Sequence, residues 1–353
     1  MKNYLAMQLV LLMGLHTAWT CCLKTGTTAE GPIDKAWWDG LSEEWKRILL
    51  INQQFQKQRL DFFTLQEKYM NRMKAAGEDD YSPLNTSLYE LNDKKRYSLG
   101  YNDFYARALR GKWIENAGGI DLNTLKELDK VYMVNGPADL TPLKKLSNLK
   151  VLIMNSCGID ISSPVSKQRV DLEPLRYLTK LEVLECAHTA IASLGPIKGL
   201  SHLRELNCEN SGVTDLSPIK NLPALERLSC GPGISNEPII TKMVNLQELY
   251  LKGFTRIPEM TRCKKLQKLS VSEGEMAIVR ASYRLTDLGP MKDLAALEYL
   301  DLNNSSYRGS LDVLNGLQNL KVITLPPVST SIMEEFKKQH EKCIIINAYQ
   351  YER

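Results

Sequence analysis

The sequence LEVLECAHTAIASLGPIKGLSH, residues 181–202, is followed directly by LRELNCENSGVTDLSPIKNLPA, residues 203–224. The two 22-residue stretches share one frame, because each apolar position of the first has a counterpart 22 residues later. Such a period is typical of stacked repeats rather than of a single closed core. The matching positions are Leu181, Leu184, Cys186, Ile191, Leu194, Pro196, Ile197 and Leu200, and then Leu203, Leu206, Cys208, Val213, Leu216, Pro218, Ile219 and Leu222.

The same frame extends over about nine units and roughly 200 residues. Within a unit, the alternation at Leu184 and Cys186 predicts a short strand with one buried face. Two steps are longer than the others, with extra residues around 160–170 and 273–285. These insertions are either loops near a binding face or structural drift. The units begin at Leu128, Leu149, Leu181, Leu203, Leu225, Leu246, Leu266, Leu297 and Leu320.

The unit LxxLxLxx(C/S/T)x(I/V)xxLxPLxxL resembles a leucine-rich repeat of the short bacterial, internalin-like kind. This resemblance implies an α/β solenoid: a right-handed arc over residues 119–330 with a parallel β-sheet on its concave face. The segment WWDGLSEEWKRI, residues 37–48, is similar to the N-terminal region of exported or lipid-anchored leucine-rich repeat proteins of the Bacteroidetes.

Both ends of the solenoid are expected to carry caps, because a stack of repeats otherwise exposes apolar surface at its ends. Residues 35–118 predict a mainly helical N-terminal cap, in which Ser42 begins a helix. Trp37, Trp38 and Trp45 fit a sugar-stacking platform, but their helical spacing favours a core role. Residues 331–353 predict a C-terminal cap made of a helix and an edge strand.

The first twenty residues resemble a signal peptide, with Lys2 before the apolar run of residues 5–15. The run is too short to span a bilayer, and no later stretch approaches that length. Cys21 or Cys22 is a candidate for lipidation, and ordinary secretion is the alternative. Residues 21–34 then read as a flexible tether. We therefore expect an exported protein, either secreted or held at the cell envelope by a signal or lipid anchor.

The formal net charge of +4 in 353 residues is too close to neutral to indicate nucleic acid or an anionic membrane as a partner. The sequence has no recognisable nucleophile, metal-binding or phosphate-binding motif. His188, His202 and His340 are not paired in any such motif. We therefore expect a protein without enzymatic activity, cofactor or metal.

Cysteines recur at one strand position, at Cys186, Cys208 and Cys230. A disulfide or thiolate metal site is geometrically conceivable there, but Leu or Val fills the same position in other units, which favours small buried apolar side chains. A second recurrent position follows the strands, where hydroxyl or thiol groups can bond neighbouring backbone carbonyls. Its members are Cys157, Thr189, Ser211 and Ser305.

A binding function is expected on the side chains that point outward from the concave sheet. Nine strands give a face on the order of 40 Å long, which suits a protein or peptide. The resemblance to internalin-like proteins implies a partner on the surface of a host or neighbouring cell. The middle of the face is acidic, at Glu185, Glu205 and Glu209. The alternative function is that of a cell-envelope structural or glycan-binding protein, in which the tyrosines hold the glycan. The candidate residues are Tyr132, Ile153, Asn155, Glu185, Glu205, Asn207, Glu209, Arg227, Glu248, Tyr250, Lys252, Lys268, Tyr299, Asp301 and Asn303.

Overall fold

The computed structural model describes residues 31–58, 119–133, 135–158, 168–191, 193–231, 233–254, 256–272, 285–303 and 305–347. The expected signal peptide, Cys21 and Cys22, residues 59–118 and most of both insertions lie outside these ranges.

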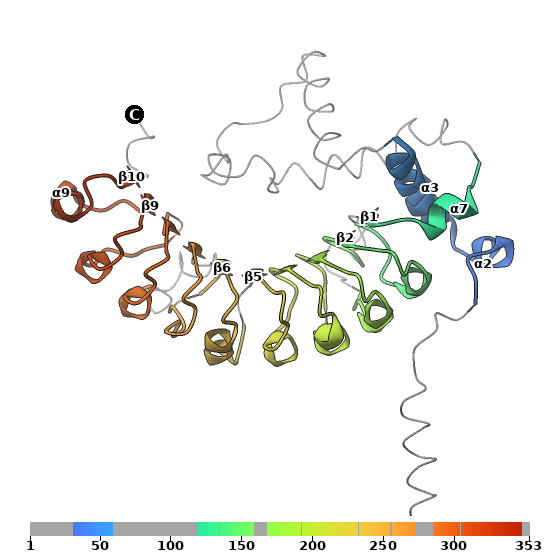
Figure 1. Ribbon diagram of the computed structural model, residues 1–353, viewed down its shortest axis with the longest axis horizontal. Helices are drawn as coiled ribbons and strands as arrows, with labels where there is room; N and C mark the ends of the chain where they lie inside the picture. Colours follow the sequence, from blue (N-terminus) through green and yellow to red (C-terminus); the bar gives the residue numbers. More distant parts are fainter. Residues whose placement is uncertain are drawn as a thin grey trace, which may run out of the picture.

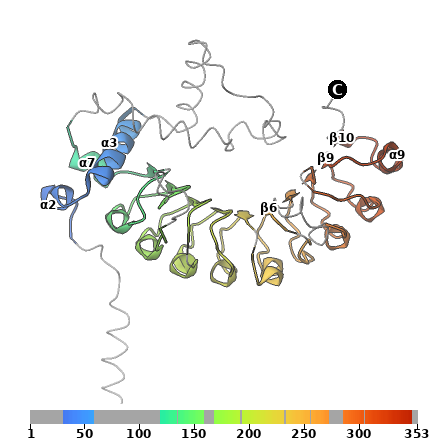
Figure 2. The same cartoon turned by 180° about the vertical axis from the view of Figure 1, so that it is seen from behind.

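The described residues form an arc with one ten-stranded parallel sheet along its inner side (Figures 1 and 2). The strands follow each other in the sheet in the order of the sequence. Each of the nine predicted units begins two residues before a strand, and the last strand belongs to the C-terminal end. The strands are β1 (Lys130–Tyr132), β2 (Val151–Ile153), β3 (Val183–Glu185), β4 (Glu205–Cys208), β5 (Arg227–Cys230), β6 (Glu248–Lys252), β7 (Lys268–Ser272), β8 (Tyr299–Asp301), β9 (Val322–Leu325) and β10 (Ile344–Asn347).

Short 3-10 segments return the chain along the outer side of the arc. Most have proline at their first or second position, where its missing N–H costs no hydrogen bond. A side chain three residues before a proline often fixes the turn, as where Asp171 Oδ1 accepts the backbone N–H of Glu173 at 2.9 Å. The segments are η2 (Thr141–Lys145), η3 (Glu173–Tyr177), η4 (Gly195–Gly199), η5 (Ser217–Ile219), η6 (Glu237–Lys242), η8 (Gly289–Met291) and η9 (Asp312–Leu314).

The core is a continuous layer of aliphatic side chains between the sheet and these outer segments. Leu184 and Leu206, which define the repeat frame, are paired in register on β3 and β4 and are almost fully buried. Each repeat contacts mainly its two neighbours, so the core grows along the arc rather than around one centre.

The N-terminal end is covered by α2 (Lys35–Asp39), α3 (Glu43–Gln58) and α7 (Leu122–Lys126). Ser42 Oγ accepts the backbone N–H of Trp45 at 3.2 Å, as expected for the start of α3. Trp45 is buried, and its Nε1 donates to the backbone oxygen of Asp139 at 2.9 Å. Trp38 is also buried, so these two tryptophans belong to the core rather than to an open sugar platform.

At the C-terminal end, α9 (Thr330–Gln339) lies beside β10. Phe336 and His340 are buried with their rings stacked, 4.3 Å apart between centroids. The predicted helix of residues 331–342 and the edge strand after Cys343 are both present, within three residues of the expected bounds. Among the described residues, no helix is long and apolar enough to cross a bilayer.

Candidate binding face

Strand register arranges the outward side chains of the concave face in two rows. We call the first and third positions of the strands the first row and the second row. The first row holds Lys130, Val151, Val183, Glu205, Arg227, Glu248, Lys268, Tyr299, Val322 and Ile344. The second row holds Tyr132, Ile153, Glu185, Asn207, Ser229, Tyr250, Ser270, Asp301, Thr324 and Ile346.

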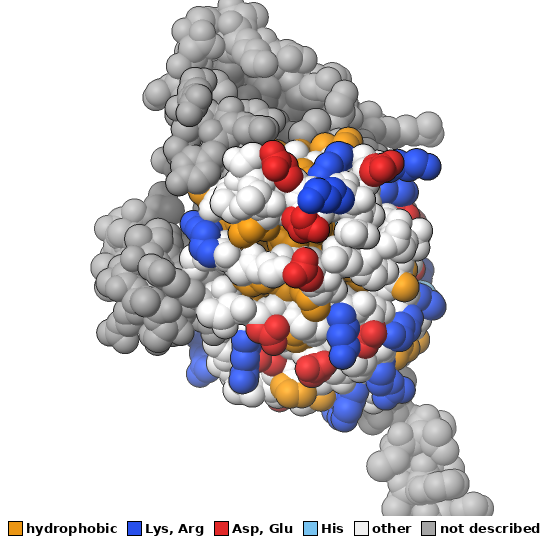
Figure 3. All heavy atoms as spheres, turned by 90° about the vertical axis from the view of Figure 1, so that its left-hand side faces the viewer, with side chains coloured by type: hydrophobic (Ala, Val, Ile, Leu, Met, Phe, Trp, Pro, Cys, Tyr) orange, Lys and Arg blue, Asp and Glu red, His pale blue; other side chains and the backbone are white. Residues whose placement is uncertain are grey.

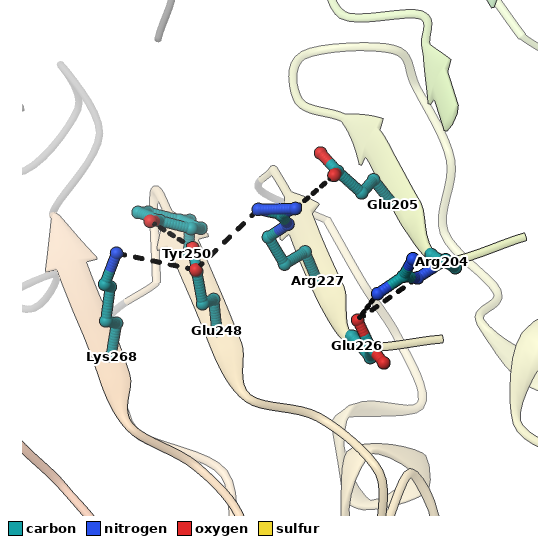
Figure 4. A network of polar contacts seen from close by, with 7 residues as sticks. All are labelled: Arg204, Glu205, Glu226, Arg227, Glu248, Tyr250 and Lys268. Atoms are coloured by element: carbon teal, nitrogen blue, oxygen red, sulfur yellow. Dashed lines mark hydrogen bonds and ion pairs between the residues drawn. The ribbon is translucent and has the colours of Figure 1, made fainter. Parts of the chain in front are cut away.

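Charges alternate in sign along the middle of the first row. Arg227 forms an ion pair with Glu205 on one side, and its Nη1 lies 3.9 Å from Glu248 Oε1 on the other. Lys268 Nζ lies 3.5 Å from the same Glu248 oxygen (Figure 4). We call these four residues of β4 to β7 the charge ladder. Their side chains are 13–31% exposed, so the ladder is partly desolvated but still reachable from the concave side.

Two tyrosines are held by the charge ladder. Tyr250 Oη donates a hydrogen bond to Glu248 Oε2 at 2.9 Å. Lys268 Nζ lies 5.7 Å from the centroid of the Tyr299 ring, within the range of a cation–π contact. Both tyrosines are half-buried, so each presents part of an aromatic ring in a fixed position.

A second set of polar contacts lies farther along the strands. Lys252 Nζ is 3.7 Å from Glu209 Oε2, and Ser229 Oγ donates to the other carboxylate oxygen of Glu209. The middle of the face is therefore not the acidic patch that the sequence indicated. Glu205 and Glu209 each have a basic partner, Arg227 in the next repeat and Lys252 two repeats along the arc.

Asp301 on β8 is a half-buried acid of the face. Ser270 Oγ donates to its Oδ2 at 3.2 Å, and the backbone N–H of Asn303 donates to its Oδ1 at 3.0 Å. Burial nevertheless raises the pKa of Asp301 above its ordinary value, because the two hydrogen bonds compensate only part of the lost hydration. Asn303 is half-buried beside it.

Four candidate residues at the N-terminal end of the face are buried: Tyr132, Ile153, Asn155 and Glu185. Phe55 of α3 meets the Tyr132 ring edge-on, with 6.2 Å between centroids. Asn155 uses its Oδ1 to accept the backbone N–H of Ala187 at 2.7 Å, which is a structural role. We therefore leave these four out of the accessible face, which begins at β4.

The charge pairing could have been predicted from the sequence, but the choice of outward residues did not compare equal positions of successive repeats. Glu205, Arg227, Glu248 and Lys268 occupy the same position of four successive repeats. Because equal positions lie on neighbouring parallel strands, about 4.8 Å apart, alternating charges at one repeat position predict ion pairs. Comparing equal repeat positions also finds the other five residues of the first row: Lys130, Val151, Val183, Val322 and Ile344.

The recurrent cysteines lie in the core behind this face. Cys186, Cys208 and Cys230 are free thiols and buried, and Cys208 is in register with Cys230. This confirms the interpretation as small buried side chains. Burial raises the pKa of all three, to about 12 for Cys208, so they carry no reactive thiolate near neutral pH.

The second recurrent position bonds the backbone, as expected. Thr189 Oγ1 donates to the carbonyl of Met154 in the preceding repeat at 2.8 Å, and Cys157 Sγ contacts that of Met133 at 3.0 Å. Ser211 and Ser305 donate instead to carbonyls of their own repeats, at 2.6 and 2.8 Å.

The histidines lie apart. His202 Nδ1 is 3.1 Å from the backbone oxygen of Thr179 on an exposed turn, while His188 follows β3 in a left-handed conformation with a φ of 60°. In the described ranges, no group of three or more His, Cys, Asp and Glu side chains could hold a metal ion.

Residues 179–221 match the family model described as leucine-rich repeats in two copies. These residues contain β3, β4 and the outer segments that follow them, and the same geometry recurs along the arc. The chain has the leucine-rich repeat fold. No curated protein sequence gives a match to it.

Among solved structures, the chain is similar to other leucine-rich repeat proteins. One is the protein LIC12759 of Leptospira interrogans, at 22% identity over 58% of this chain, with a TM-score of 0.40. That match covers 62% of the Leptospira chain, less than two thirds of its length. Another is the internalin inlF of Listeria monocytogenes, at 18% identity over 70% of this chain and 89% of that chain, with a TM-score of 0.41. A plant peptide hormone receptor, RGFR1 in complex with RGF2, matches at 17% identity over 59% of this chain and 37% of that chain, with a TM-score of 0.37.

Proposed function

We propose that this leucine-rich repeat protein is a non-enzymatic binding module that holds a protein or peptide partner on its concave face between β4 and β8. The observation that carries the proposal is the charge ladder with its two tyrosines. These side chains hold each other in place before any partner binds, so little side-chain conformational entropy is lost on binding.

The size of this surface favours a polypeptide. The ladder and Tyr299 occupy the five strands from β4 to β8, which at about 4.8 Å per strand gives a face on the order of 20 Å long. Tyrosine and arginine are the residue types that most often dominate binding energy, and here they lie on neighbouring strands. A row of this length fits several side chains of a partner rather than one small molecule.

The ladder favours a partner that also carries both signs of charge. Glu205 and Glu248 alternate with Arg227 and Lys268, so a uniformly acidic or basic segment meets repulsion at every second strand. A segment with alternating charges, in contrast, meets attraction along the whole row. We expect such complementarity to set specificity and register more than affinity.

A glycan is the second ligand class that the sequence suggested, and the geometry gives it less support. The tyrosines do not gather into one stacking platform, because Tyr132 is buried on β1 while Tyr250 and Tyr299 lie two strands apart in different rows. Export, with a lipid anchor at Cys21 or Cys22 or with secretion, is part of the proposal and rests on the leader sequence alone.

The test is a pull-down from envelope and cell-surface extracts with the full chain as bait. The variant bait carries Arg227→Ala, Tyr250→Ala and Tyr299→Ala on the concave face. A matched control carries Arg204→Ala and Glu226→Ala, an ion pair of 2.9 Å that lies beside the strands rather than on them (Figure 4). Circular dichroism of all three baits checks that each is folded.

The proposal expects a protein that the wild type and the control retain and the concave-face variant loses. Equal retention by all three baits would refute the assigned face. Recovery of glycan alone, lost on removal of Tyr250 and Tyr299, would replace the protein partner by a carbohydrate.

A further inference from the structure

The first strand of the sheet has its outer edge closed by a side chain. Asn52 of α3 accepts the backbone N–H of Tyr132 through Oδ1 at 2.9 Å and donates from Nδ2 to the Tyr132 carbonyl at 3.0 Å. These are the two kinds of bond that a neighbouring strand would make to β1. At this end, α3 takes the place of a further strand.

The last strand has an edge of a different kind. Within the part of the chain that the structure describes, β9 is the only strand that joins β10. The N–H of Ile344 donates to the carbonyl of Lys321 at 2.8 Å, which directs the backbone groups of Ile344 towards the sheet. Because these groups alternate along a parallel strand, the N–H and C=O of Ile345 point to the other side. Such an edge is a template for another strand.

The composition of β10 does nothing to discourage pairing. Its sequence is IIIN, without the lysine or proline that natural proteins often place on an open edge. Ile344 is 59% exposed, and Val244 at 41% is the other exposed large hydrophobic among the described residues. Figure 3 views this end of the molecule, where hydrophobic surface lies between acidic and basic side chains.

We propose that β10 pairs antiparallel with β10 of a second copy of this chain, around a two-fold axis at Ile345. A two-fold contact brings the same surface of both copies together, so the surface must complement itself. An aliphatic strand meets this condition, because Ile344 of each copy lies opposite Ile346 of the other without charge repulsion.

The charges on α9 also complement themselves across the two-fold axis. Glu334 and Glu335 precede Lys337 and Lys338, and all four are exposed. Figure 1 shows α9 end-on beside β10, so the helix runs along the direction of the strands. The two-fold axis that sets the strands antiparallel sets the two helices antiparallel as well, which turns the acidic part of each towards the basic part of the other.

The closed edge at β1 limits the assembly to two copies. Head-to-tail addition would need β10 of one copy to pair with β1 of the next, and Asn52 already occupies the backbone groups of Tyr132. Two copies joined through β10 form a closed dimer with one continuous sheet, whose concave faces remain open to a partner.

Sedimentation velocity of the full chain, over a range of protein concentrations, tests this dimer. Ile344→Lys places a charge at the contact, and Ile345→Pro removes the outward N–H while the Ile344 bond to β9 remains. Val244→Lys is the matched control, since it changes the other exposed aliphatic side chain, which precedes β6, four strands from β10. Hydrogen exchange of the Ile345 amide gives a second measurement on the unaltered protein.

We expect a concentration-dependent dimer, with the dissociation constant raised roughly tenfold or more by each β10 variant and unchanged by the control. The Ile345 amide should exchange more slowly as the dimer forms. A chain that stays monomeric at every concentration would overturn the proposal. A dimer that both β10 variants leave intact, or an assembly that grows beyond two copies, would overturn it as well.

Discussion

The side-chain amide of Asn52 makes two hydrogen bonds to the backbone of Tyr132, a residue 80 positions away in the sequence. Its Nδ2 also donates to the carbonyl of Ile48 at 2.8 Å. Asn52 is 1% exposed, so water cannot replace any of these bonds. One amide thus joins the N-terminal helix to the first strand of the arc.

Replacing Asn52 should therefore destabilise the protein strongly. Asn52→Ala leaves the N–H and C=O of Tyr132 without these partners, and we expect a loss of about 2–4 kcal/mol in the free energy of unfolding. Urea unfolding followed by circular dichroism measures it. Asn148→Ala is the control, because Asn148 also donates to a backbone carbonyl, that of Lys126 in α7 at 2.9 Å, but is solvent-accessible. A loss of less than 1 kcal/mol in both variants would contradict the role given to Asn52.

The hydroxyl of Thr189 should contribute measurably to the stacking of repeats. It donates to Met154 O at 2.8 Å and accepts the N–H of Cys157 at 3.2 Å, and it is fully buried. Thr189→Val keeps the shape but removes both bonds and leaves the N–H of Cys157 only its longer bond to Met154 O at 3.4 Å, which should cost about 1–3 kcal/mol in the free energy of unfolding.

The matched control for Thr189 is Thr241→Val. The Thr241 hydroxyl makes a bond of similar length, 2.9 Å to Pro238 O, but on an exposed segment where water can replace it. We expect a change within about 0.5 kcal/mol there. Equal effects of the two substitutions in thermal or urea unfolding would show that the inter-repeat bond contributes no more to stability than an exposed one.

Asp301 should make stability depend on pH. Burial raises its pKa in the folded protein, so the folded state holds the proton more tightly than the unfolded state. The cost of the buried charge is present above the folded-state pKa and is relieved as pH falls towards the ordinary value of 3.8. Asp301→Asn should therefore be more stable than the wild type at neutral pH, and this difference should disappear in acid.

Urea unfolding at several pH values measures the Asp301 effect. Asp293→Asn serves as the control, because Asp293 is an exposed aspartate on the outer side of the arc. A difference between Asp301→Asn and the wild type that stays constant from neutral to acid pH would show that ionisation of Asp301 is not its cause.

The sequence predicted the elements that depend on the repeat frame. Leu181 and Leu203 predicted the positions of β3 and β4, because the apolar positions of a 22-residue period can stack in only one register. The contacts of Asn52 were not predictable, because nothing local relates α3 to β1. The burial of Glu185 was missed for a related reason. Alternation tells which side of the sheet a residue faces, and it says nothing about what covers that side.

The charge ladder shows an intermediate case. Glu205 and Arg227 are distant in the sequence, but the repeat frame makes them neighbours, so their pairing was available from sequence once equal positions were compared. The distances between these side chains could not be predicted from the sequence. Arg227 Nη1 lies 3.9 Å from Glu248, whereas Arg227 is in closer contact with Glu205. Such differences depend on side-chain rotamers that periodicity does not determine.

The core thiols should resist alkylation in the folded protein. The thiolate is the reactive form, and burial raises the pKa of Cys208 to about 12 and those of Cys263 and Cys343 to about 11. Native protein treated with iodoacetamide at neutral pH should leave these cysteines unmodified in peptide mass spectra, whereas protein in denaturant should be modified at each. Ser201→Cys introduces a thiol on an exposed turn as a positive control and should react within the same time. Modification of Cys208 in native protein as fast as of the introduced thiol would mean that the sheet opens readily, which contradicts a continuous core behind the binding face.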